Sequence, residues 1–145
     1  GCCGNNFESK KAIRNAIHKN TLDHKYFGIK EEEDNVSFRE RVGSSNLRKG
    51  VCRNLISVTK KDGSEQILCP LHPTKHAGKD LRTGHCNIYY LCKTAKEFSE
   101  WDKEMQEMFL DFLREKKLDN IDYSMLMADD SLLSEFYLRF KKEDV

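Results

Sequence analysis

Apolar residues near the start of the chain recur every three to four positions, which is the spacing of one helix face. Two stripes follow this spacing: Ile13, Ala16 and Ile17, and then Leu22, Tyr26, Phe27 and Ile29. Gly28 interrupts the second stripe, and glycine weakens a helix interior. We therefore predict that residues 6–34 are mostly helical, and that residues 43–46, Gly-Ser-Ser-Asn, form a loop.

The last third of the chain, residues 94–142, carries the strongest helical pattern. Thr94 and Glu97 form a capping box, in which each side chain satisfies a backbone donor. One apolar face continues from there at helical spacing: Phe98, Trp101, Met105, Met108, Phe109 and Phe112. This pattern predicts one long amphipathic helix, followed by one or two short helices over residues 121–127 and 132–140.

Between these regions the pattern changes to that of strands. Residues 55–59 and 66–68 are rich in β-forming residues, and Asp62-Gly63 between them supplies the positive φ of a tight hairpin. The chain of 145 residues has the common size of one domain. We therefore predict a mostly helical α+β fold, a single domain of residues 1–145 with a hairpin-and-loop module at 50–92.

The register of the hairpin decides which chemical groups meet. We expect Thr59 to face Ser64 across the turn. This register places Cys52 and Cys69 near each other and close to His72, at the open end of the hairpin. The strand pairing thus predicts a cluster of metal-ligating side chains from residues that are distant in sequence.

The hairpin-and-loop module is also rich in cysteine and histidine, the usual ligands of structural zinc. The candidates are Cys52, Cys69, His72, His76, His85, Cys86 and Cys92, of which His76 and His85 read as loop histidines. Two four-ligand sets stay open. An all-thiolate set suits zinc or an iron–sulfur cluster: Cys52, Cys69, Cys86 and Cys92. A Cys3His set favours zinc: Cys52, Cys69, His72 and Cys86.

Competing chemistries for these residues are less well supported. The six cysteines would suit three disulfides in a secreted protein, but no secretory signal is visible, and interleaved histidines favour metal. No Gly-x-Ser-x-Gly, phosphate-binding glycine loop or His-Glu-x-x-His is present, so we predict no catalytic residue. The basic loop 78–82 either holds an anion or uses Asp80 and Arg82 to orient metal ligands.

Charge is distributed unevenly along the chain, although the net charge is only +1. Residues 39–96 contain 12 Lys and Arg against 4 Asp and Glu, whereas residues 97–145 contain 7 against 14. The simplest interpretation is that the basic middle packs against the acidic tail. The alternative is an anionic partner such as a nucleic acid, although few aromatic residues for base stacking lie near the basic ones.

The ends of the chain bear on its location. No apolar run approaches the roughly 20 residues that span a bilayer, so we predict a cytoplasmic protein without a transmembrane segment. Gly1-Cys2-Cys3 suggests a lipid-anchored N-terminus as a lesser alternative, since Asn5 stands where an acylation signal needs Ser or Thr. The oligomeric state is left open.

The run Cys69-Pro-Leu-His72-Pro73, followed by residues 78–82 and a further cysteine, resembles bacterial cysteine-cluster proteins described as zinc- or iron-chelating. Cys2-Cys3 would correspond to the doubled cysteine of that family's CxxCxxCC motif, but the two preceding cysteines are missing. The resemblance covers residues 50–92 and the N-terminal pair. It implies metal chelation without an assigned reaction.

These observations predict a small metal-binding protein, with structural zinc, that acts as an interaction module for an unknown protein partner. The metal would replace the apolar core that the polar middle lacks. Two alternatives stay open: a metal-dependent or redox enzyme, and a nucleic-acid-binding module that uses the basic segment 39–96.

Overall fold

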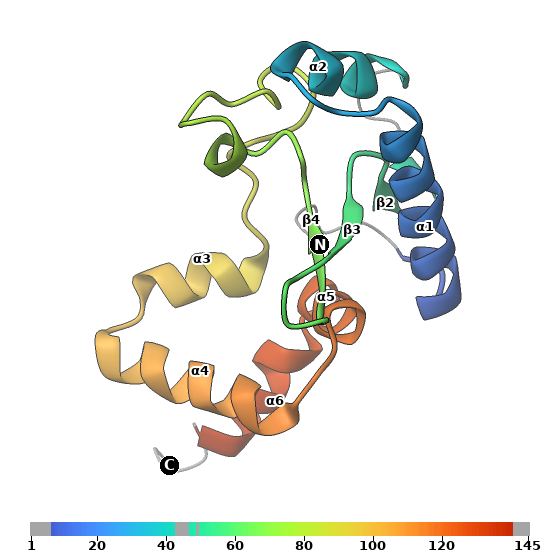
Figure 1. The fold of residues 1–145 in the computed structure, drawn as a ribbon. Coiled ribbons are helices and arrows are strands. Elements are labelled where there is room, and N and C mark those ends of the chain that lie inside the picture. The colour runs from blue at the N-terminus through green and yellow to red at the C-terminus, as the bar shows by residue number, and fades with distance from the viewer. Residues whose placement is uncertain (1–6, 43–46, 49, 141–145) are drawn as a thin grey trace. The chain divides into compact units, whose positions relative to one another are not determined.

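The computed structural model describes residues 7–42, 47–48 and 50–140. These residues form two compact units, which we call unit 1 (residues 7–89) and unit 2 (residues 90–140) and describe separately. Six α-helices and two small antiparallel sheets lie in the described residues (Figure 1). This confirms the mostly helical α+β class, while the single-domain organisation stays a prediction.

Unit 1 begins with helix α1 (Lys10–Tyr26), which is capped by Ser9: its Oγ accepts the Ala12 N–H at 3.1 Å. The predicted first stripe is confirmed, because Ile13, Ala16 and Ile17 are the buried apolar residues of the helix. The second stripe is only partly helical, since α1 ends before Gly28. Gly28 has a φ of +55°, a left-handed conformation that glycine adopts at little energetic cost.

Helix α2 (Glu32–Glu40) begins in the acidic run, where Asp34 Oδ2 accepts the Glu31 N–H at 2.9 Å. The prediction that the helical region ends at residue 34 is therefore wrong. Helix α2 extends to Glu40 because the fully buried Phe38 packs against His24 of α1, and tertiary packing stabilises a short helix. The predicted loop at residues 43–46 lies outside the described residues.

The predicted hairpin is confirmed, but its register is wrong by one residue. Strand β3 (Ile56–Thr59) pairs with β4 (Glu65–Leu68), and Thr59 faces Glu65 instead of Ser64. The Gly63 N–H donates to the Lys60 carbonyl at 3.0 Å, and Gly63 has a φ of +84°. These features define a three-residue loop with a glycine bulge, and that loop adds one position to the pairing.

The second sheet corrects the placement of Cys52. Strand β1 (Leu47–Arg48) pairs with β2 (Val51–Cys52), and Cys52 faces Leu47. The Leu55 N–H then donates to the Cys52 carbonyl at 3.2 Å, so that a turn separates β2 from β3. Cys52 therefore lies outside the predicted hairpin, and the register of that hairpin does not place it beside Cys69.

Helix α1 holds this turn in place (Figure 1). The fully buried Asn20 donates from Nδ2 to the carbonyls of Cys52 and Leu55, each at 3.0 Å. The Ser57 N–H donates to Thr21 Oγ1 at 3.0 Å. A buried side chain that satisfies two backbone carbonyls orders the chain between the two sheets, because an unpaired buried carbonyl is costly.

Unit 2 contains four helices where the sequence predicts one long helix and one or two short ones. They are α3 (Lys93–Glu100), α4 (Lys103–Lys116), α5 (Asn120–Ala128) and α6 (Ser131–Phe140). The long helix is broken at Trp101, whose ψ is 151°, and Asp102 Oδ1 caps α4 by accepting the Met105 N–H at 2.8 Å. The short helices α5 and α6 appear where they are predicted.

The predicted capping box at the start of α3 is also wrong. Cys92 is the N-cap residue, and its Sγ accepts the Ala95 N–H at 3.4 Å. Thr94 lies inside the first turn and is fully buried. Glu97 instead accepts a hydrogen bond from the Tyr137 hydroxyl, and burial together with this carboxylate raises the pKa of Tyr137 to about 12.

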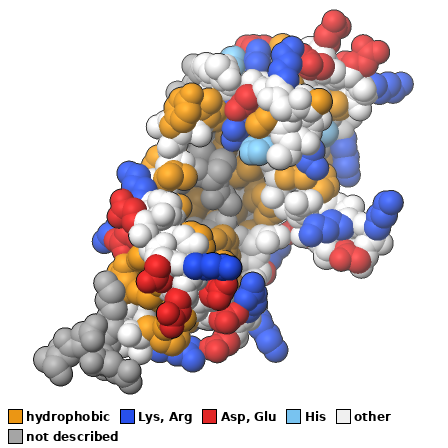
Figure 2. Space-filling model, turned by 90° about the vertical axis from the view of Figure 1, so that its left-hand side faces the viewer, with side chains coloured by type: hydrophobic (Ala, Val, Ile, Leu, Met, Phe, Trp, Pro, Cys, Tyr) orange, Lys and Arg blue, Asp and Glu red, His pale blue; other side chains and the backbone are white. Residues whose placement is uncertain are grey.

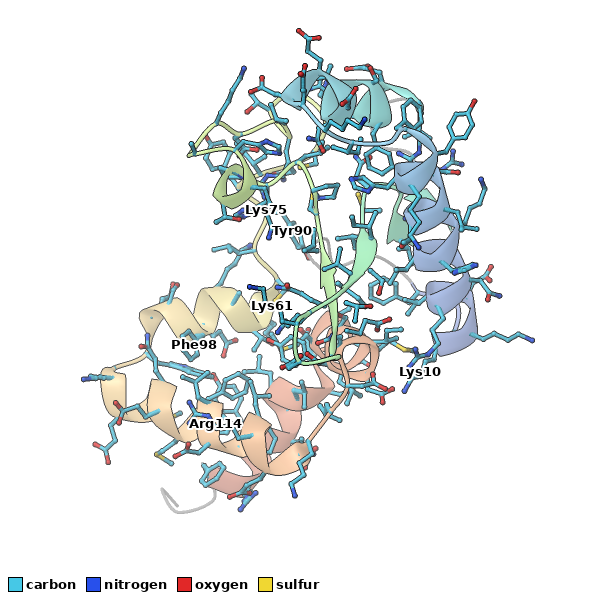
Figure 3. The ribbon with its side chains drawn as sticks, viewed as in Figure 1. Lys10, Lys61, Lys75, Tyr90, Phe98 and Arg114 are labelled. Atoms are coloured by element: carbon cyan, nitrogen blue, oxygen red, sulfur yellow. The ribbon has the colours of Figure 1, made fainter. Side chains whose placement is uncertain are left out.

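Aromatic side chains form the core of unit 2, in agreement with the predicted apolar face. Its buried members are Phe109, Phe112, Leu132 and Phe136. Phe98 packs against them from α3 (Figure 3). Trp101 contacts the rings of Phe109 and Phe136 at centroid distances of 5.4 and 5.5 Å. Ring contacts of this kind add stability beyond the buried area.

Candidate metal centre

Three of the five predicted ligands lie on a long irregular segment of unit 1, residues 69–86. Its only regular element is the short 3-10 helix η1 (Pro73–Lys75), and only Pro70, Leu71 and Leu81 are buried. Irregular loops of this length are uncommon in compact domains unless they have a function. The segment itself adds only Leu71 and Leu81 to the apolar core, although Val51, Leu55 and Ile56 of the predicted polar middle are buried too.

Polar contacts with α2 hold the segment in place. Arg39 donates from Nη1 to the Leu81 carbonyl at 2.9 Å, and Lys79 forms an ion pair with Glu32. His85 Nε2 lies 3.5 Å from Glu40 Oε1. The sequence analysis missed this role of α2. The only signal for it was the acidic run 31–34, followed by the charged residues 39–41.

Within the segment, the run from Cys69 to His72 forms a turn. The His72 N–H donates to the Cys69 carbonyl at 3.2 Å. His72 Nδ1 lies 2.9 Å from Thr74 Oγ1 and accepts the Thr74 N–H at 3.2 Å. His76 Nε2 lies 2.7 Å from the Pro70 carbonyl oxygen, an arrangement that fits the predicted loop histidine.

The stretches around Leu71 and Leu81 meet beside the Asp80–Arg82 ion pair. The Leu81 N–H donates to the Leu71 carbonyl at 3.2 Å. Arg82 donates from Nε and Nη2 to the two carboxylate oxygens of Asp80, each at 2.8 Å. These bonds lower the pKa of Asp80 to about 2, and the charge of nearby His72 acts in the same direction. A bidentate pair of this kind is geometrically specific.

Arg82 also interacts electrostatically with both cysteines of the segment, Cys69 and Cys86. The hydrogen bonds with Asp80 raise the pKa of Arg82 most, and the negative charges of Cys86 and Cys69 in their thiolate forms raise it further. The Cys86 N–H donates to the Arg82 carbonyl at 3.2 Å. One guanidinium therefore lies within electrostatic range of both thiols, although these are far apart in sequence. Because Asp80 occupies the guanidinium, the arrangement fits ligand orientation better than anion binding.

The remaining predicted ligands lie elsewhere. Cys52 is in β2 of unit 1, and Cys92 caps α3 in unit 2. Cys86 is exposed, whereas Cys52, Cys69 and Cys92 are half-buried. Across the part of the chain that the structure describes, no group of three or more His, Cys, Asp or Glu side chains is arranged to hold a metal ion. The zinc and iron–sulfur assignments therefore stay predictions.

The surface bears on the alternative partners. On the face drawn in Figure 2, the Lys and Arg side chains (blue) are interspersed with Asp and Glu side chains (red). Affinity for nucleic acid depends on several cations that face the phosphate backbone together. The nucleic-acid alternative stays a prediction. None of the described helices has the length and apolar character needed to cross a membrane.

Comparisons of the chain with protein-family models, with curated proteins and with solved structures gave no match. The resemblance to cysteine-cluster proteins therefore stays a prediction.

Proposed function

We propose that unit 1 is a zinc-stabilised interaction module in which Cys69, His72 and Cys86 bind the metal, with Cys52 as the fourth ligand. The observation that carries the proposal is the position of the Asp80–Arg82 pair. Arg82 is within electrostatic range of Cys69 and Cys86, and Asp80 is within range of His72. Three side chains with zinc-binding chemistry are thus within electrostatic range of one ion pair.

The donor chemistry of these residues fits zinc. Thiolate and imidazole ligands are typical of closed structural sites with four ligands. Thr74 engages His72 Nδ1, so Nε2 is the ring nitrogen suited to the metal. Arg82 would offset the negative charge of the thiolates, and charged residues next to the ligands commonly tune metal affinity in this way.

The choice of Cys52 over Cys92 rests on the two compact units. Cys52 belongs to unit 1 together with the other three ligands, whereas Cys92 belongs to unit 2 and accepts a helix N-terminal amide. The resulting Cys3His set favours zinc over an iron–sulfur cluster, for which all-cysteine ligation is usual. Zinc would tie together a loop that buries only three residues and so keep its surface in one conformation for a protein partner.

Substitution of single cysteines tests the ligand set. Cobalt(II) is the probe, because tetrahedral thiolate ligation gives a strong absorption that can be titrated and competed with zinc. We expect Cys69→Ser and Cys86→Ser to weaken metal affinity by at least about 100-fold, which is the upper range for loss of a supporting residue. The matched control is Cys92→Ser, which should bind as tightly as the wild type.

The metal affinities of these variants show whether the segment binds metal and which cysteine is the fourth ligand. Unchanged affinity in both Cys69→Ser and Cys86→Ser would show that the segment is not a metal site. If Cys92→Ser loses affinity and Cys52→Ser retains it, the fourth ligand is Cys92 instead of Cys52. If both variants lose affinity, the all-thiolate set with its iron–sulfur alternative regains support.

A further inference from the structure

The second feature of unit 1 that invites a functional interpretation is the contact between α1 and α2 around Phe38. The imidazole of His24 packs edge-on against the fully buried Phe38 ring, with the centroids 5.0 Å apart and the planes at 89°. Its Nε2 atom is enclosed and has no hydrogen-bond partner among the described residues. A buried nitrogen without a partner is uncommon in folded proteins and calls for an explanation.

Arg41 packs on the same phenylalanine ring. Its guanidinium carbon lies 3.9 Å from the Phe38 centroid, and Nη1 donates to the Phe38 carbonyl at 3.0 Å and to Asn54 Oδ1 at 3.2 Å. Nη2 donates to the Arg53 carbonyl. Arg41 therefore joins the end of α2 to the turn between β2 and β3, with only 9% of its side chain exposed.

The charges around His24 favour its neutral form. Burial lowers the pKa of His24 below its ordinary value of 6.5, and the charge of Arg41 lowers it further. On α1, Asp23 Oδ2 pairs with Arg41 Nε at 3.2 Å, and its Oδ1 pairs with Lys19 at 2.5 Å. From the β2–β3 turn, the carbonyl of Arg53 and the side-chain oxygen of Asn54 reach this corner as acceptors for Arg41, and Arg41 is the cation that acts on His24.

We propose that this corner is an acid-sensitive latch: protonation of His24 places a cation beside Arg41 and loosens α2 and the β2–β3 turn from α1. Neutral imidazole packs on Phe38 at no charge cost, whereas imidazolium must be enclosed next to a guanidinium that Asp23 already balances. The latch does not require zinc, since His24 is not among the proposed ligands, but the turn that it loosens begins at Cys52.

The direction of the pH effect follows from linkage. The pKa of His24 is lower in the folded state than in the unfolded state, so the unfolded state binds more protons in the range between the two values. The contribution of His24 to stability is therefore complete above pH 6.5. It falls as the pH decreases below 6.5 and levels off below the lowered pKa.

Hydrogen exchange of the α2 amides measures this loosening directly. Between about pH 7.5 and pH 5, after correction for the intrinsic exchange rate, the opening constant of α2 should rise about tenfold for each unit by which the pKa is lowered. In His24→Gln this rise should disappear. In the matched control His18→Gln, an exposed histidine on the same helix, it should persist.

The pH titration of the His24 ring signal in the NMR spectrum of the wild-type protein gives a second measurement that needs no variant. A midpoint below 6.5, together with an acid-dependent opening of α2, supports the latch. A midpoint at or above 6.5 overturns it, as does an acid-dependent opening that is unchanged in a folded His24→Gln protein.

Discussion

Replacement of Phe136 by alanine is expected to lower the free energy of unfolding of unit 2 by about 3–5 kcal/mol. Phe136 is fully buried, and its ring contacts Phe109 at a centroid distance of 5.0 Å and Phe140 at 4.9 Å. Its removal leaves a cavity between α4 and α6 that the surrounding rings cannot fill without leaving their preferred conformations. The loss corresponds to a large share of the stability of a small domain.

The fluorescence of Trp101 in a urea titration measures this effect. Trp101 is the only tryptophan of the chain and contacts Phe136 at 5.5 Å, so its emission reports on this core. The matched control is Leu138→Ala on the same helix, where 65% of the side chain is exposed. We expect the control to change the unfolding free energy by less than about 0.5 kcal/mol. Equal losses in both variants would contradict the described core.

The helices of unit 2 show both what local sequence patterns predict and what they miss. The aromatic face could be predicted because Phe98, Phe109 and Phe112 recur at helical spacing. The break at Trp101 could not, because the apolar spacing continues on both sides of it. Only the capping chemistry of Asp102 marks the new helix, and an aspartate within a polar helix face is too common to indicate a cap by itself.

The candidate site was predictable in its ligand types but not in its geometry. Asp62-Gly63 correctly predicted a hairpin, yet the loop length that sets the register became known only from the bonds of Lys60 and Gly63. The position of Cys52 depends on Asn20, a residue of α1 far away in the sequence. Contacts of this range leave no periodic signal in the chain.

The second large effect is expected from removal of the metal. Structural zinc binds to small peptide sites with an apparent free energy of about 10–16 kcal/mol, and much of this energy appears as folding stability. A chelator should therefore lower the thermal midpoint of unit 1 strongly, because residues 69–86 bury only Pro70, Leu71 and Leu81. Far-UV circular dichroism, recorded with and without chelator, measures the shift.

Two controls make the result specific. Re-addition of zinc should restore the original midpoint, since the effect of a ligand that binds only the folded state follows mass action. The Cys69→Ser variant should unfold at the lower midpoint whether or not chelator is present. A chelator effect of the same size in Cys69→Ser and in the wild type would place the metal elsewhere in the chain.

Native mass spectrometry of the protein, purified without a metal-affinity step, tests the central proposal most directly. The account predicts a single species that carries one zinc ion per chain, and loss of that ion in Cys69→Ser. A folded wild-type chain that stays metal-free in the presence of equimolar zinc would contradict the account.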